Sequence, residues 1–97
     1  MRTYRFHRKA RAELRQALEH YKGEGDDIGR AFATEARNAI NHILAFPSIG
    51  PVDTAGARRK TVRGFPFSIV YALRDDDLIE VLAFPHQRRT DYWRDRL

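Results

Sequence analysis

The chain has 97 residues, no cysteine and a formal net charge of +5; 42% of its residues are hydrophobic and 32% are charged. This length and balance predict one globular domain, residues 1–97, and exclude a disulfide framework, a cysteine nucleophile and a thiolate metal site. The apolar stretches are far shorter than the roughly 20 residues that cross a bilayer, and none follows Met1, so we expect a cytoplasmic protein with no membrane contact.

Positive charge is concentrated toward the two ends of the chain. Residues 1–22 carry a net +5, residues 23–57 carry −3 and residues 58–97 carry +3. Fifteen of the 18 basic residues are arginines, whose planar guanidinium groups bind phosphates and carboxylates through paired hydrogen bonds. The distribution predicts a polyanion or an acidic protein segment as the partner.

The first half of the chain predicts one strand and two helices. Residues 3–7 alternate aromatic with polar side chains, which is typical of a short strand with one buried face. Apolar residues then recur at helical spacing over residues 8–21 and again over residues 28–44. Gly23 and Gly25 are expected to end the first helix, and Pro47 disfavours helical backbone in the residue before it. The short link between the two helices predicts a helix hairpin.

The second half predicts a loop and three strands. Residues 47–56 are rich in turn-forming residues and have no period. The period of the apolar pattern then falls to two, which predicts strands over residues 58–63, 67–73 and 78–84. Thr90 is a candidate N-cap for a short terminal helix over residues 91–97.

Together these elements predict an α+β fold. Its parts are an N-terminal strand, a two-helix hairpin packed on an antiparallel sheet with three consecutive C-terminal strands, and a short terminal helix. Strands that follow one another through tight links favour antiparallel pairing. Both helices must bury their apolar stripes on one sheet face, which leaves the other face and the strand ends for function.

Conventional catalytic and metal-binding motifs are absent, so we expect no metal and no cofactor. We interpret three isolated histidines as surface or half-buried residues: His7, His20 and His42. A cluster near the C-terminus is the first candidate site: His86, Arg88, Arg89, Tyr92, Trp93, Arg94 and Arg96. Such a set can bind phosphates, stack on bases or form a protein interface. Alternatively, its two aromatic residues pin a terminal helix to the sheet while the arginines stay solvated.

A basic strand is the second candidate site, with Arg58, Arg59, Lys60 and Arg63 in a six-residue run. Strand alternation places Arg59 and Arg63 on one face and the other two on the opposite face. Charge on a strand is typical of a sheet edge protected from pairing with other chains. Such an edge can also accept a partner's strand.

The chain resembles the ParE/RelE superfamily of toxins from bacterial type II toxin–antitoxin modules. The resemblance lies in the order of elements and in three segments: Phe46 to Gly50 (FPSIG), Val62 to Tyr71 (VRGFPFSIVY) and His86 to Trp93 (HQRRTDYW). It covers nearly the whole chain. It implies a toxin that is held inactive, in a hetero-oligomer, by a small acidic antitoxin encoded beside it.

Members of this superfamily differ in their target. RelE-like toxins are ribosome-dependent mRNA endonucleases, whereas ParE-like toxins inhibit DNA gyrase. Positions where RelE-like toxins carry basic groups on the central strands fall here on Thr61 and Ser68, and the position of their C-terminal tyrosine falls on Trp93. Most of the nuclease groups are therefore missing, and the resemblance favours a non-enzymatic gyrase inhibitor.

The resemblance assigns the two candidate sites. We expect the target to be bound by His86, Arg88, Arg89, Tyr92 and Arg94, and the antitoxin to be bound by Arg58, Arg59, Lys60 and Arg63. The alternative is an endonuclease that acts on the ribosome and mRNA, with His86 as base and Arg63, Arg89 and Tyr92 in support. A second alternative is a plain nucleic-acid-binding module, which the consecutive acidic residues 75–77 disfavour because they would repel a phosphate backbone.

Overall fold

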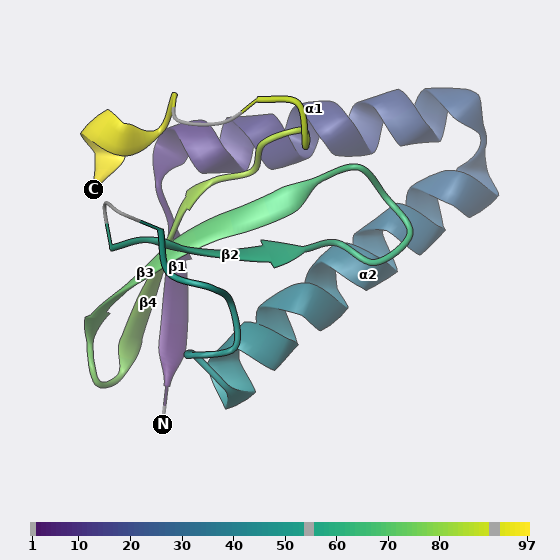
Figure 1. The fold of residues 1–97 in the computed structure, drawn as a ribbon. Helices are drawn as coiled ribbons and strands as arrows, with labels where there is room; N and C mark the ends of the chain where they lie inside the picture. Colours follow the sequence, from purple (N-terminus) through teal and green to yellow (C-terminus); the bar gives the residue numbers. More distant parts are fainter. Residues whose placement is uncertain (1, 54–55, 90–91) are drawn as a thin grey trace.

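The computed structural model describes residues 2–53, 56–89 and 92–97 (Figure 1). The elements are β1 (Thr3–Phe6), α1 (Arg8–Glu24), α2 (Asp26–Ala45), β2 (Arg58–Thr61), β3 (Ser68–Asp75), β4 (Leu78–Ala83) and the 3₁₀ helix η1 (Arg94–Arg96). This order confirms the predicted α+β fold. The predicted cap Thr90 lies outside the described residues, as does Asp91, and the described part of the terminal helix is a single 3₁₀ turn.

The sheet has the strand order β1-β4-β3-β2. β2 and β4 pair antiparallel with β3, as the tight links predict. β1 pairs parallel with β4, so the sheet is mixed and not antiparallel throughout. The reason is the connection: a long crossover through two helices can return the chain to a parallel position, which a hairpin turn cannot do.

The helix hairpin covers one face of this sheet (Figure 1). α1 begins after His7, whose Nδ1 accepts a hydrogen bond from the amide of Lys9, and it ends at Gly25. The two helices approach each other closely at Gly29. A Cβ at this position would lie 2.8 Å from a side-chain carbon of Lys22. No helix in the described part of the chain is long and apolar enough to cross a membrane.

Both faces of the sheet are buried. Toward the helices lies a large core that includes Tyr21, Phe32, Ile69, Tyr71 and Phe84. On the opposite face lies a second, smaller core made of Ala57, Val70, Ala72, Leu82, Ala83 and Trp93, with Tyr92 packed against it. The expectation that this face is left for function is therefore wrong for its centre, because the chain after β4 returns across it and inserts Trp93.

The loop between α2 and β2 is fixed to the sheet by one buried hydroxyl. The Tyr71 hydroxyl donates to the carbonyl oxygen of Pro47 (2.9 Å) and accepts from the amide of Gly50 (3.2 Å). Nη1 of Arg58 donates to the carbonyl oxygen of Gly50 (2.7 Å). Gly50 lies so close to β2 that a Cβ there would overlap the carbonyl oxygen of Arg59.

Substituting alanine at two glycines is expected to change stability in opposite directions. Gly50→Ala forces the loop away from Arg59 and should lower the free energy of unfolding by about 1–3 kcal/mol. Gly23→Ala, in α1, meets no atom within 4 Å and should raise it by about 0.5–1 kcal/mol, because alanine favours the helix. Urea unfolding of both variants measures this, and equal midpoints would contradict the close approach at Gly50.

Candidate functional site

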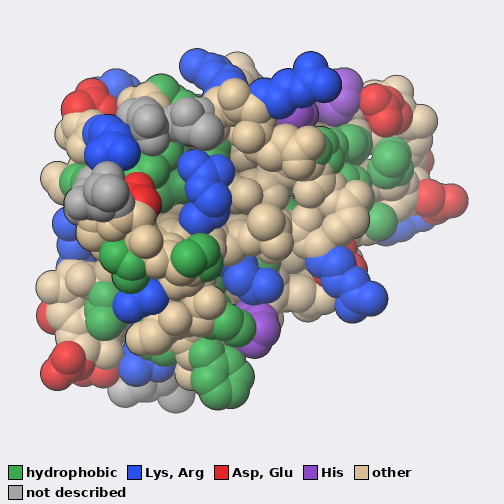
Figure 2. All heavy atoms as spheres, in the orientation of Figure 1, with side chains coloured by type: hydrophobic (Ala, Val, Ile, Leu, Met, Phe, Trp, Pro, Cys, Tyr) green, Lys and Arg blue, Asp and Glu red, His purple; other side chains and the backbone are tan. Residues whose placement is uncertain are grey.

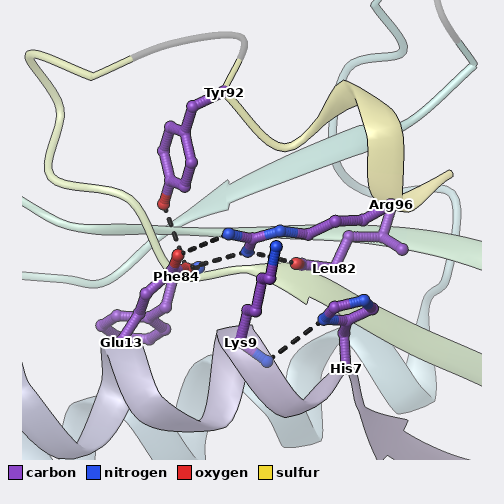
Figure 3. Close-up of polar contacts among 7 residues, drawn as sticks. All are labelled: His7, Lys9, Glu13, Leu82, Phe84, Tyr92 and Arg96. Atoms are coloured by element: carbon purple, nitrogen blue, oxygen red, sulfur yellow. Dashed lines mark hydrogen bonds and ion pairs between the residues drawn. The ribbon is translucent and has the colours of Figure 1, made fainter.

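The residues at the C-terminus converge on one carboxylate of α1, that of Glu13 (Figure 3). Its Oε1 accepts hydrogen bonds from the Phe84 amide (2.9 Å) and the Tyr92 hydroxyl (3.0 Å). Arg96 donates to both carboxylate oxygens, through Nη1 to Oε1 (3.2 Å) and through Nη2 to Oε2 (2.9 Å). Sequence reasoning missed Glu13, because on α1 it looks like any glutamate of a solvated helix face.

The Glu13–Arg96 ion pair is largely shielded from water. The Arg96 side chain is 8% exposed and that of Glu13 is 22% exposed. Arg96 Nη1 also donates to the carbonyl oxygen of Leu82 (2.9 Å), so the guanidinium ties α1 to β4. A shielded charge pair of this kind needs such additional hydrogen bonds to offset the loss of hydration.

Tyr92 is a hydrogen-bond donor in this arrangement. Burial, followed by the charge of Glu13 and the hydrogen bond to it, raises the pKa of Tyr92 to about 12. The hydroxyl therefore keeps its proton at neutral pH and cannot act as a base. The guanidinium of Arg89 lies over the Tyr92 ring, 4.7 Å from its centre.

His86 accepts a hydrogen bond through one of its ring nitrogens. Its Nδ1 accepts a hydrogen bond from the Arg88 amide (3.2 Å), so the neutral imidazole carries its proton on Nε2. Its ring packs edge-on against Phe67, with the ring centres 5.3 Å apart. Taking a proton at Nε2 would require the other tautomer and would break the hydrogen bond from Arg88.

Three of the predicted site residues line one hollow of about 220 Å³ between α1 and the chain after β4. The lining consists of Glu13, Gln16, Ala17, His20, Phe67, Phe84, His86, Arg89 and Tyr92. Arg88 and Arg94 are exposed nearby in sequence, and Arg94 lies over the Trp93 ring at 5.9 Å. Trp93 itself is 2% exposed, so it pins this segment to the sheet.

Arg63 lies apart from these residues. It lines a separate hollow of about 180 Å³ beside α2, together with Lys60, Thr61, His42 and Glu35. Of the four residues considered for a nuclease, the structure therefore brings His86, Arg89 and Tyr92 together and places Arg63 elsewhere.

The basic strand β2 is a sheet edge, as predicted. Arg58 pairs with Tyr71 and Lys60 with Ile69, on the helix side, whereas Arg59 pairs with Val70 on the opposite side. The Gly50 loop already lies against the backbone of Arg59. Among the described residues, the loop covers this edge at Arg58 and Arg59 and leaves the part after Arg59 uncovered.

An apolar groove lies at the other sheet edge, beside β1. It has a volume of about 220 Å³ between β1, α1 and α2, and its walls include Tyr4, Phe6, Leu14, Leu18, Ala36, Arg37 and Ile40. Tyr4 is 46% exposed. The adjoining surface of α1 adds Arg11 and Arg15. The groove thus combines an apolar floor with a basic rim.

Basic side chains are spread widely over the sheet side of the molecule, and acidic ones lie mostly near its margins (Figure 2). This distribution fits an acidic partner better than a neutral one.

Three comparisons with known proteins bear on this geometry. A family model described as the ParE toxin of the type II toxin–antitoxin system parDE matches residues 4–91. Among solved structures, a chain from the chromosomal ParDE system of P. aeruginosa is similar in fold, with a TM-score of 0.73, 22% identity and coverage of 89% of this chain and 96% of that one. No curated protein matches.

Proposed function

Because the chain belongs to the ParE toxin family of type II toxin–antitoxin systems, we propose that it arrests bacterial growth by binding and inhibiting DNA gyrase. The surface that binds gyrase is formed by His86, Arg88, Arg89, Tyr92 and Arg94. The same proposal places the protein in the cytoplasm, where gyrase acts.

The state of the polar groups in the C-terminal hollow supports binding over cleavage. A ribonuclease that uses the 2′-hydroxyl of RNA needs a group to take its proton. Here His86 Nδ1 already accepts a hydrogen bond from the Arg88 amide, the Tyr92 hydroxyl donates to Glu13, and Glu13 is paired with Arg96. The nuclease positions on the strands hold Thr61 and the buried Ser68, neither of which is a cation.

We also propose that an acidic antitoxin occupies the apolar groove at β1. The rim residues Arg11, Arg15 and Arg37 complement acidic side chains, and the groove floor fits the apolar face of an amphipathic segment. Of the basic residues on and after β2, Lys60 and Arg63 provide a second contact beside α2. Arg58 contributes less, because its guanidinium donates to the carbonyl oxygens of Ser48 and Gly50 in the α2–β2 loop. The backbone of Arg59 lies against the same loop.

One set of assays tests this proposal. Purified toxin should reduce DNA supercoiling by gyrase and leave mRNA intact on translating ribosomes. Co-expression of a small acidic protein encoded beside it should restore growth. New cuts in mRNA at codon spacing, seen by primer extension while supercoiling is unaffected, would overturn the gyrase proposal in favour of a ribosome-dependent endonuclease.

A further inference from the structure

Glu13 holds the C-terminal segment, here the described residues 84–89 and 92–97, at both of its ends. The Phe84 amide donates to Glu13 where the segment begins, and Tyr92 and Arg96 donate to it where the segment ends. One carboxylate therefore closes the chain into a loop against α1 (Figure 3). The proposed function gives Glu13 no contact with gyrase.

The candidate target-binding arginines depend on residues that this carboxylate fixes. Arg89 lies over the Tyr92 ring, and the Tyr92 hydroxyl is bonded to Glu13. The Arg89 amide donates to the carbonyl oxygen of His86 (2.9 Å), within the closed loop. The position of the Arg89 guanidinium is therefore set through Tyr92 by Glu13.

Folding of the segment has a second, separate anchor. Trp93 is buried in the core on the far face of the sheet, and this contact does not involve Glu13. Losing the carboxylate should therefore leave the segment attached to the sheet through Trp93. The segment would lose its fixed path across α1, because the Phe84 amide, the Tyr92 hydroxyl and the Arg96 guanidinium would lose their common acceptor.

We propose that Glu13 is a positioning residue for target binding: it orders the segment so that Arg88 and Arg89 are presented in one arrangement. The inference rests on the proposed role of these arginines. Ordering them before binding reduces the conformational entropy that binding must otherwise remove.

Glu13→Gln tests this, because glutamine keeps the shape of the side chain, removes the charge that pairs with Arg96, and replaces one acceptor oxygen with an NH2 group that cannot accept from that guanidinium. Hydrogen exchange at the amides of Arg89 and Arg96 should become about tenfold faster or more, while β3 and α2 stay protected. Growth arrest in cells should need about tenfold more toxin. Glu19→Gln is the matched control, since Glu19 is exposed on the same helix; both readouts should equal those of the wild type.

Unchanged exchange in Glu13→Gln, or faster exchange with full growth arrest, would overturn the positioning role. If that variant does not fold, Tyr92→Phe serves instead, because it removes one donor and keeps the ring under Arg89. It should show intermediate exchange and intermediate toxicity, and wild-type behaviour in both would overturn the proposal. Growth arrest tests the positioning role of Glu13, whereas a supercoiling assay with purified gyrase tests the gyrase proposal. The two proposals can therefore fail separately.

Discussion

Trp93→Ala is expected to lower the free energy of unfolding by about 3–5 kcal/mol, the range for removing a large buried aromatic side chain. Trp93 is 2% exposed and is the largest member of the core on the face opposite the helices. The other members of this core are small or aliphatic, and the strands beneath them are paired on both sides, so the structure cannot close over the cavity. Denaturant unfolding followed by circular dichroism measures the loss.

Trp93→Phe is the matched control for this prediction. The indole Nε1 is buried and has no hydrogen-bond partner among the described residues. Phenylalanine removes that unpaired donor as well as part of the volume, so the two effects oppose one another and the loss should be about 1 kcal/mol. Alanine and phenylalanine variants of equal stability would show that Trp93 is not a core residue in solution.

The fold could be predicted because its signals are local. The helical spacing of apolar residues over 8–21 and 28–44 predicts α1 and α2, and the period of two predicts β2, β3 and β4. Pairing between elements was predictable only where short links restrict it. β1 is joined to the sheet through both helices, so nothing local indicates that it lies parallel to β4.

The candidate site was predictable where its residues are neighbours in the chain. His86, Arg89 and Tyr92 lie in one short segment and share one hollow. Arg63 has the right chemistry for the same site, but the turn after β2 carries it to the side of α2. Residue type alone does not show that Arg89 lines this hollow and that Arg63 does not.

Glu13 could not be found from the sequence at all. Its partners Phe84, Tyr92 and Arg96 are 71, 79 and 83 residues away. Like Glu19, it lies among charged residues on a helix whose apolar face packs elsewhere. Contacts of this separation depend on how the C-terminal segment returns over the sheet, where Trp93 anchors it.

Replacing Arg88 or Arg89 with alanine should abolish most of the toxicity and leave the melting temperature nearly unchanged. Both side chains are exposed, and exposed substitutions of this kind usually change stability by less than about 0.5 kcal/mol. Arginines at the centre of a protein interface commonly contribute more than about 1–2 kcal/mol of binding free energy, so inhibition of gyrase should weaken by about tenfold or more.

Arg30→Ala is the control, because it removes the same charge from an exposed arginine at the start of α2, paired there with Asp27. If the general positive charge drives toxicity, all three variants should weaken equally; if the C-terminal surface binds the target, only Arg88→Ala and Arg89→Ala should. Growth arrest in cells and thermal unfolding of the purified protein are measured for the same variants.

Arginine variants that stay folded and fully toxic would place the target-binding surface outside the C-terminal segment. The apolar groove at β1 would then be the first place to search, since its basic rim is the next surface with both charge and apolar area for a protein partner.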